Sequence, residues 1–542
     1  MKKLSLILSV LFLVVVSALA KTRTQQEMMQ VARSILSQTH GKKLIRATTV
    51  PQLEIIKQSS QLTIIGGKGG FSVIANDDRI PAVLGYSDKE YIDNQISPAF
   101  LWWLNTINEQ IENNLAQGTV TEVVLPDQKR FASNVDALLV TEWGQNAPYY
   151  NQTPTYTSGK SEQHYVTGCV ATAMAQIMYY HRWPEKGKGY VSYYFTPEGS
   201  TNSQKLSVNL ASSPYEWNNM LPVYKGVSYS DAQANAVSML MMHCGYSVNM
   251  QYTRTGSGAF TSDAADALRK RFYYNENMHF YRRDFFPVKE WMEKIFNELN
   301  DGYPILYGAQ RSDGGHEFVL DGYDENGLVH VNWGWDGNQN GYFDIASLNG
   351  YTTGQEMVLV RKNDLTIPYS SYWGMNGNLQ ITEPTPQILN INFTAYNLDY
   401  NAFTGQVGII AKRLETNQIH VLGSMETTVE YLHGGSFTIE NVDISAFSKG
   451  TYRIYAATFA TDKDTEWQPI RCHEDLNNSY ILSVYDGGYS LSAENNANWT
   501  DIKNVAIDRQ QITSPRIFDL QGREVKTPQK GIYIINGRKV VK

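Results

Sequence analysis

Apolar positions near the start of the chain follow helical spacing first and strand spacing afterwards. From Thr24 to Ser37 they recur every three or four residues, which predicts a helix. Short apolar runs broken by Gly, Asp and Pro come next, and a second helical pattern follows them. The runs predict strands at 62–67, 70–77 and 81–86, and the later pattern predicts a helix from about Ser97 to Leu115. The segment 116–132, which contains Pro126 and Lys129-Arg130, then predicts an exposed linker.

At Phe131 the pattern changes to a mixture of helical and strand segments. Helices are expected at 170–181, 231–243, 262–272 and 287–300, and a Gly- and Trp-rich region from 303 to 360 predicts strands. We therefore expect an α+β domain at residues 131–365.

Short β-type runs dominate the rest of the chain. Turns are expected near Gly405, Gly423, Gly434-Gly435 and Gly450, and this spacing predicts a β-sandwich of the immunoglobulin-like type at 366–510. Residues 511–542 form a separate strand-turn-strand pattern.

The first twenty residues have the pattern of a secretory signal peptide. Lys2 and Lys3 precede an apolar run that closes on Ala18-Leu19-Ala20. A transmembrane anchor is the alternative, but the run from Leu4 to Val16 spans only about 20 Å as a helix against a bilayer core of about 30 Å. We expect cleavage after Ala20, a secreted or cell-surface protein, and no membrane span in the mature chain.

Composition narrows the function. Among the 542 residues, 42% are apolar and 18% are charged, which excludes an intrinsically disordered chain. The net charge of −7 offers no basic surplus for nucleic acid. Three cysteines exclude a disulfide scaffold and a Cys-only zinc site, and we expect neither a metal ion nor an organic cofactor. Cys244 and Cys472 are expected to be structural.

Cys169 is the candidate nucleophile. It stands in TGCVATAMAQIMYYH, where Thr167 is a possible cap and Gly168 allows close approach just before a run of good helix formers. A helix N-terminus and a nearby imidazolium lower a thiol pKa into the range of about 3.5 to 7.5. The alternative is an ordinary buried cysteine.

His316 is the best placed of the ten histidines to act as a base. The turn signal Asp313-Gly314-Gly315 puts it at the beginning of a strand, and a hairpin through 324–327 leads to LVHVNWGW. That hairpin is expected to bring Asn332 beside His316, where its side-chain carbonyl fixes the imidazole tautomer and Trp333 screens the bond from water. The alternative is a surface His on an ordinary hairpin.

Cys169, His316 and Asn332 taken together favour a catalytic site over an ordinary buried cysteine and a surface histidine. The order Cys, His, Asn, with about 150 positions between thiol and imidazole, is the papain-like arrangement. Gln145, in TEWGQNAPYYN, is a candidate oxyanion donor because its side-chain amide can act beside the Cys169 backbone N–H.

The stretches TGCVATAMAQIMYYH, GGHEFVLDGY and VNWGWDGNQNGYF resemble the signature stretches of the streptopain family of secreted bacterial cysteine peptidases, which have a papain-like fold. The resemblance implies that Cys169 is the nucleophile, His316 the general base and acid, Asn332 the imidazole orienter, Gln145 the oxyanion donor and Trp333 the screen. It also suggests Ser257 and Trp335 for substrate binding. Glu317 departs from the family pattern, where a small residue is expected, and strand alternation should point it away from the thiol.

The resemblance extends to both ends of the chain. KGGFSVIANDDRIPAVLGYS and SPAFLWWLNTINEQI are similar to the family's propeptide, an α/β unit that blocks the cleft. Residues 21–130 are therefore expected to be an intramolecular inhibitor, removed by cleavage near Lys129-Arg130. The tail 511–542 resembles C-terminal sorting modules of proteins exported across the outer membrane, and the alternative is a structural hairpin.

These features together predict a secreted cysteine endopeptidase made as a zymogen and acting on proteins or peptides. One alternative is a cell-wall peptide amidase with the same Cys-His chemistry. Another is an adhesion protein on an inactive peptidase scaffold.

Overall fold

The computed structural model describes residues 21–41, 52–118, 123–311, 314–345, 354–364, 367, 369, 371–399, 401–461, 463–473, 476–495, 517–518, 532–535 and 538–541. The predicted signal peptide lies outside these residues. The chain divides into two compact units, one of Met1–Asp93 with Leu104–Val123, and one of Asn94–Trp103 with Val124–Lys542.

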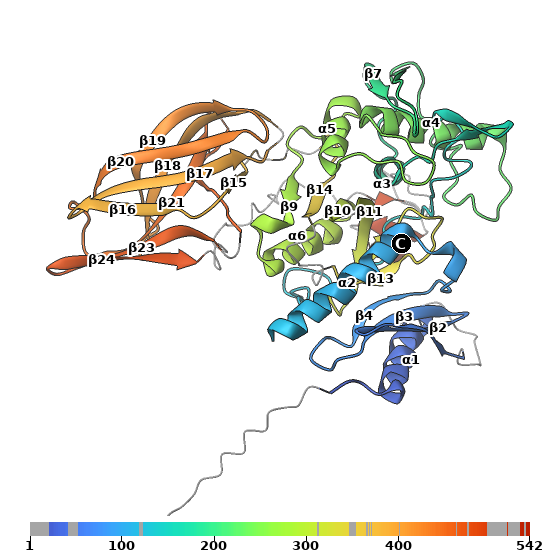
Figure 1. Cartoon of the computed structure of the whole chain (residues 1–542), viewed down its shortest axis with the longest axis horizontal. Coiled ribbons are helices and arrows are strands. Elements are labelled where there is room, and N and C mark those ends of the chain that lie inside the picture. The colour runs from blue at the N-terminus through green and yellow to red at the C-terminus, as the bar shows by residue number, and fades with distance from the viewer. Residues whose placement is uncertain are drawn as a thin grey trace, which may run out of the picture. The chain divides into compact units, whose positions relative to one another are not determined.

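The first unit packs a helix on an antiparallel sheet. The sheet has the order β1 (Glu54–Gln58), β2 (Leu62–Gly67), β3 (Gly70–Ala75) and β4 (Val83–Ser87), and helix α1 (Gln25–Gly41) covers it (Figure 1). Met28 and Ala32 of α1 pack on Ile65 and Ile74, so the helical face read from the sequence is the buried one. Strand β1 was not predicted. Helix α2 (Pro98–Gln117) is divided between the two units.

The second unit contains the expected α+β domain, whose centre is formed by six neighbouring antiparallel strands. The strand order is β13 (Gly341–Phe343), β12 (Val329–Asn332), β11 (Gly314–Tyr323), β10 (Ile305–Arg311), β14 (Gly354–Leu359) and β9 (Phe280–Arg282). The four predicted helices are confirmed as α3 (Cys169–His181), α4 (Asp231–Ser247), α5 (Thr261–Arg271) and α6 (Val288–Asn300). Short elements at η1 (Asp93–Gln95), β5 (Thr155–Ser158), β6 (Ser161–His164), β7 (Tyr190–Phe195), β8 (Gln204–Asn209) and η2 (Arg283–Phe285) were not predicted.

Helices α3, α4 and α5 share one core with the sheet (Figure 1). Met174 and Met178 of α3 meet Leu240 of α4, Leu268 of α5 and Val319 of β11 in this core. Cys244 is fully buried there, and its thiol lies 3.6 Å from the Met178 sulfur. Because α3 is buried along almost its whole length, the position of its first residue is fixed by the core.

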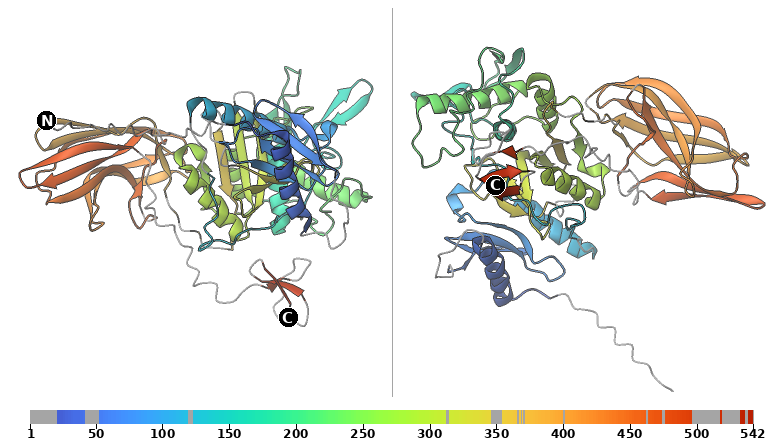
Figure 2. Two further views of the ribbon diagram at one scale, coloured as in Figure 1. Left: turned by 90° about the horizontal axis from the view of Figure 1, so that it is seen from below. Right: turned by 180° about the vertical axis from the view of Figure 1, so that it is seen from behind.

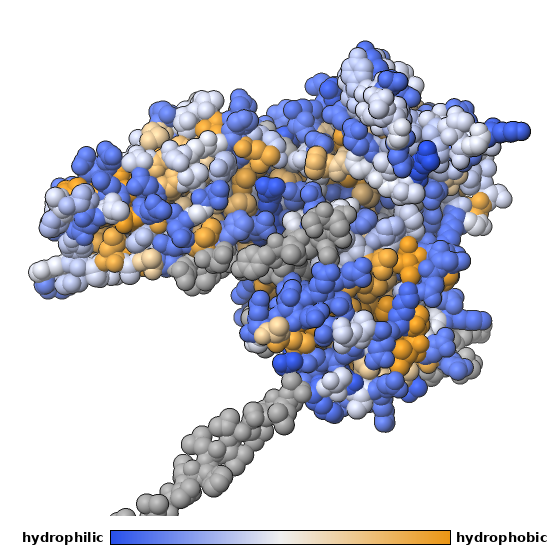
Figure 3. All heavy atoms as spheres, viewed as in Figure 1, coloured by the Kyte–Doolittle hydropathy of each residue, from blue (hydrophilic) through white to orange (hydrophobic). Residues whose placement is uncertain are grey.

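Two sheets form the C-terminal sandwich (Figure 2). In one, β17 (Ile388–Asn397) pairs with β15 (Trp373–Met375), β16 (Gln380–Thr385) and β20 (Gly434–Asp443). The other has the order β19 (Ile419–Val429), β18 (Phe403–Arg413), β21 (Gly450–Ala460), β23 (Asn477–Tyr485) and β24 (Gly488–Asn495), with β22 (Gln468–Pro469) beside β21. The face of the sandwich that Figure 3 shows carries both hydrophilic and hydrophobic residues.

Two of the turns expected in this region were wrong. Gly405 and Gly423 lie inside long strands, whereas Gly434 and Gly450 begin strands as expected. A Cβ on Gly423 would lie 2.5 Å from Ile439 Cγ2, and one on Gly405 would lie 2.2 Å from the Phe459 carbonyl oxygen. These glycines therefore allow close approach between neighbouring chains.

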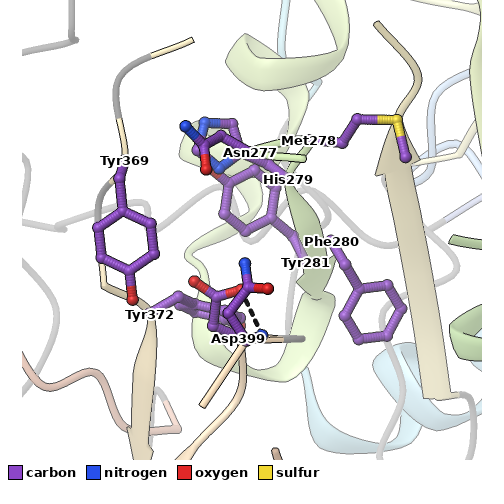
Figure 4. A pocket seen from close by; sticks show the side chains of 9 residues that line it. Asn277, Met278, His279, Phe280, Tyr281, Tyr369, Tyr372 and Asp399 are labelled. Atoms are coloured by element: carbon purple, nitrogen blue, oxygen red, sulfur yellow. Dashed lines mark hydrogen bonds between the residues drawn. The ribbon is translucent and has the colours of Figure 1, made fainter. Parts of the chain in front are cut away.

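The sandwich contacts the α+β domain through β9, η2 and α6. Arg471 donates two hydrogen bonds to the Glu290 carboxylate, at 3.0 and 2.8 Å, and its guanidinium lies 4.2 Å from the Phe286 ring centroid. Next to this contact is a recess of about 340 Å³, including space open to solvent, lined by 277–281 on one side and by Tyr369, Tyr372, Asp399 and Asn401 on the other (Figure 4). None of the predicted site residues lines it.

Three short strands, β25 (Ile517–Phe518), β26 (Ile532–Ile535) and β27 (Arg538–Val541), form a separate antiparallel sheet in the tail. No helix in the described part of the chain is long and apolar enough to cross a bilayer. Within the same residues, no group of three or more His, Cys, Asp or Glu side chains is arranged to hold a metal ion.

Candidate active site

Cys169 is the first residue of α3, as the sequence indicates, but the cap differs from the expected one. The N-cap is Gly168, with φ 88° and ψ 146°, and no side chain caps the helix. Thr167 instead lies with its hydroxyl 3.0 Å from that of Thr172. A Cβ on Gly168 would lie 2.8 Å from both the Met250 sulfur and the Ser257 carbonyl oxygen. Only glycine meets both the dihedral and the space requirement immediately before the thiol.

Gln145 lies beside the segment that leads into Cys169. Its backbone carbonyl accepts a hydrogen bond from the Thr167 N–H at 3.2 Å, and the residue is 7% exposed. Its side-chain amide makes no hydrogen bond to the described residues. Gln145 therefore contacts the chain two residues before Cys169, and its role as an oxyanion donor stays a prediction.

The start of strand β11 lies against the Cys169 sulfur. The backbone N–H of Glu317 donates to this sulfur, and His316 is the preceding residue. Burial raises the pKa of Cys169 to about 11, the N–H groups of Glu317, Val170 and Cys169 lower it, and the Glu317 carboxyl raises it. The lowered thiol pKa expected from the helix terminus was therefore wrong for this form of the chain, because burial outweighs the N–H donors.

His316 is half-buried and contacts the N-terminal segment Asn94–Trp103. The Trp102 and His316 rings lie 6.2 Å apart in an edge-to-face arrangement at 63°. The same segment is held by two hydrogen bonds, from Ser97 N to Gln339 Oε1 at 2.8 Å and from Trp103 Nε1 to the Asp344 carbonyl at 3.1 Å. A tryptophan from outside residues 131–365 thus occupies one side of the predicted base.

The predicted hairpin is confirmed, with a register that separates Asn332 from His316. Asn332 stands opposite Val319, three residues further along β11 than His316. Its side-chain carbonyl accepts hydrogen bonds from Gln176 Nε2 at 3.2 Å and from the Gly334 N–H at 3.1 Å, and its amide donates to the Thr141 carbonyl at 2.7 Å. Asn332 is therefore fixed in place by partners other than the imidazole in this form.

Gln176 is a positioning residue that the sequence analysis missed. It is fully buried, and besides its bond to Asn332 its carbonyl accepts from Thr141 Oγ1 at 2.8 Å and from the Trp143 N–H at 3.3 Å. It follows Cys169 by two helical turns. A lone amide in the apolar face of CVATAMAQIMYYH was the available signal. Gln176 joins the nucleophile's helix to β12 and to the segment that bears Gln145.

The remaining candidates differ in exposure. Trp333 is 1% exposed, donates from Nε1 to the Gln339 carbonyl at 2.9 Å, and packs on Phe100 and Phe318. Ser257 is 3% exposed, and its hydroxyl donates to the Val166 carbonyl at 2.7 Å. Trp335 is half-buried. Ser257 thus supports the chain before Cys169, and substrate binding by Ser257 and Trp335 stays a prediction.

The arrangement suits acyl transfer. Cys169, a residue of intermediate exposure, stands at a helix start, and an imidazole-bearing strand lies against its sulfur. Gln145 contacts the segment that precedes it. Cys244 and Cys472 are fully buried, so Cys169 is the accessible thiol.

Comparison with known proteins gives three consistent findings. The model of the Peptidase C10 family matches residues 143–343. Streptopain of Streptococcus pyogenes is 34% identical over 293 residues, which cover 52% of this chain and 72% of streptopain. The thiol protease/hemagglutinin PrtT of Porphyromonas gingivalis is 29% identical over 439 residues, which cover 75% of this chain but only about half (49%) of PrtT. A solved structure of a prointerpain A fragment from Prevotella intermedia is 38% identical, with a TM-score of 0.53, and the match covers 57% of this chain and 98% of that fragment.

Proposed function

Because the chain belongs to the peptidase C10 family of cysteine peptidases, we propose that it is a secreted cysteine endopeptidase made as an inactive precursor. The observation that carries the proposal is the Cys169 thiol at the start of α3, with the His316–Glu317 end of β11 against its sulfur. Proteins or peptides are the substrates, and the reaction needs no metal ion or organic cofactor.

The reaction proceeds through an acyl-enzyme. The Cys169 thiolate attacks the scissile carbonyl carbon, and the oxyanion accepts hydrogen bonds from the Gln145 side-chain amide and the Cys169 N–H. His316 takes the thiol proton as the thiolate forms, gives it to the leaving amine, and then activates the water that hydrolyses the thioester. Asn332 orients the imidazole, which requires one of its bonds from Gln176 and Gly334 to be released on activation. Trp333 shields that pair from water.

Latency comes from residues 21–130. Trp102 lies on the His316 ring, and Phe100 of the same segment, fully buried, packs on Trp333 at 5.9 Å between ring centroids. The thiol is also protonated at neutral pH in this form, since burial raises its pKa to about 11. Cleavage in 116–132 and departure of the segment free the imidazole and readmit water to the sulfur, and both changes favour the thiolate.

The cleavage point lies near Lys129-Arg130. Asp127 to Arg130 form a turn in which the Arg130 N–H donates to the Asp127 carbonyl, and Lys129 is exposed. The next residue, Phe131, is buried, so the exposed turn is where a protease gains access. N-terminal sequencing of the secreted form tests this, and a mature start at residue 21 contradicts it.

Export rests on the sequence of residues 1–20, and sorting at the outer membrane rests on the tail 511–542. The sandwich at 366–510 is a binding or spacing module. Deleting the tail should leave proteolysis intact and release the protein from the cell surface into the medium.

Casein hydrolysis by the processed protein tests the proposed activity. Wild type should release peptides and should be labelled at Cys169 by an active-site-directed epoxide, whereas Cys169→Ala and His316→Ala should do neither. Activity on cell walls with none on casein would support the peptide amidase. Absence of both activities and of labelling after removal of residues 21–130 would support the inactive adhesion scaffold.

A further inference from the structure

Glu317 is a buried acid whose backbone contacts the proposed nucleophile. It is 4% exposed, and its backbone N–H donates to the Cys169 sulfur while its side chain turns into the domain. One carboxyl oxygen, Oε2, lies 2.8 Å from Thr261 Oγ1, and the other, Oε1, has no hydrogen-bond partner. No Lys, Arg or His of the described chain lies within ion-pair distance of it. The proposed reaction assigns this carboxyl no role.

A second carboxyl lies across the sheet from the first. Gly308 of β10 is flanked by Glu317 of β11 and by Glu356 of β14, and a Cβ at Gly308 would lie 2.2 Å from Thr261 Oγ1 and 2.6 Å from Glu317 Oε2. Glycine therefore opens the space in which the Thr261 hydroxyl sits. That hydroxyl also hydrogen-bonds Glu356, which forms an ion pair with Arg282 at 3.2 Å.

The number of protons in this network determines which carboxyl is charged. A hydroxyl has one proton, so Thr261 donates to only one of the two carboxyls, and the other must supply the second hydrogen bond. Glu356 has the Arg282 cation and stays ionised. Glu317 has no cation, and an unpaired charge buried this deeply is avoided by protonation. The order is therefore Glu317 to Thr261 to Glu356 to Arg282.

We infer that Glu317 is a positioning residue held as a neutral acid, and that its ionisation state sets the proton affinity of Cys169. The inference rests on the proposed function for its role in catalysis, but not for its chemistry. A neutral Glu317 leaves no negative charge behind a forming thiolate. An ionised Glu317 opposes the thiolate, and the Glu317 carboxyl accordingly raises the pKa of Cys169.

The charged and titratable groups around Glu317 come from every neighbouring element. They are Cys169 of α3, His316 of β11, Glu356 of β14 and Arg282 of β9, whereas α5 presents the neutral Thr261 and β10 presents Gly308. Burial and the Glu356 charge raise the pKa of Glu317 well above its usual range. Ionisation of Glu317 therefore requires a pH well above that at which an exposed carboxyl ionises.

The test measures alkylation of Cys169 by iodoacetamide as a function of pH in the uncleaved His316→Ala chain. This chain cannot process itself and has no imidazole at the site, so the result does not depend on peptidase activity. In this background Glu317→Gln should react faster than Glu317, by a factor of about ten, once the pH exceeds that at which Glu317 ionises, because the charge that opposes the thiolate is absent. Below that pH the two should react at the same rate. Peptide mapping assigns the label, and Cys244 and Cys472 are fully buried.

Glu298→Gln is the matched control. Glu298, on α6, is 2% exposed and also has an Oε1 without a hydrogen-bond partner among the described residues. Unlike Glu317, it forms an ion pair, with 2.7 Å between its Oε2 and Arg361 Nη2. It should leave the pH dependence unchanged. Thr261→Val should shift the pH at which the rates diverge, because the Thr261 hydroxyl is the only hydrogen-bond partner of the Glu317 carboxyl among the described residues, and Thr261→Ser should restore it. Identical profiles for Glu317 and Glu317→Gln would overturn the inference. Loss of casein hydrolysis in wild type with the predicted alkylation intact would overturn only the proposed function.

Discussion

Replacing Gly168 by alanine should displace the proposed nucleophile. A side chain at φ 88° and ψ 146° costs about 1–3 kcal/mol of backbone strain. The new Cβ would also lie 2.8 Å from the Met250 sulfur and the Ser257 carbonyl oxygen, and such overpacking costs about 1–3 kcal/mol more. The sum of about 2–6 kcal/mol is a large part of the stability of a domain, so thermal unfolding should begin several degrees lower.

The same change should reduce reactivity. Relief of the contact moves the chain at Cys169, and a misplacement of about 1 Å can cost a factor of about 100 in rate. Gly258→Ala is the matched control, because a Cβ there meets nothing within 4 Å and its φ is not positive. Thermal melts and the rate of epoxide labelling of processed protein measure the two effects. A Gly168→Ala protein that melts and labels like Gly258→Ala would refute the reasoning.

Three further predictions concern other contacts. Gln176→Leu leaves Thr141 Oγ1 and the Trp143 N–H buried without their hydrogen-bond partner and removes one hydrogen bond to Asn332. Urea denaturation should show that the free energy of unfolding falls by about 2–5 kcal/mol, and by less in Gln176→Glu. Wild-type stability in Gln176→Leu would be inconsistent with the network. Burial lowers the pKa of His243 from 6.5 to about 4. The neutral ring therefore contributes stability that is present above pH 6.5 and is lost as the pH falls toward 4, by up to about 3 kcal/mol. His243→Gln should flatten the dependence of the melting temperature on pH over this range. Arg471→Ala should make the segment around 362–372 more sensitive to limited proteolysis, because Glu290 loses two hydrogen bonds and Phe286 loses a packed guanidinium. Replacement of Lys449, an exposed cation that pairs with Asp486, should have no such effect.

Local sequence patterns predicted the helices well, including the position of Cys169 at the start of one of them. The start of α3 was expected at 170 and is at 169. The prediction was close because the apolar run and the preceding glycine, which mark the start of a helix, both lie within one turn of it. The hairpin of β11 and β12 was found from its turn residues, which is also a local signal. The turns at Gly405 and Gly423 failed because glycine in a strand looks the same in sequence as glycine in a turn.

The electrostatic state of the site needed the tertiary structure. A helix terminus predicts a low thiol pKa, but the amount of burial around Cys169 depends on residues distant in sequence. The partners of Asn332 come from 141, 176 and 334, and no spacing rule links these positions. Glu317 was expected to point away from the thiol, and its side chain does turn toward α5, but the paired carboxyl at Glu356 was not foreseen.

The anchoring of Asn94–Trp103 has a kinetic consequence for activation. Hydrogen bonds at Ser97 and Trp103, together with the Phe100 ring, hold this segment independently of the peptide bonds in 116–132. Cutting the chain and losing the segment are therefore separate events, and the second is a dissociation with its own rate constant. Freshly cut protein should show a lag before full turnover, and the final rate should rise on dilution as the noncovalent fragment leaves.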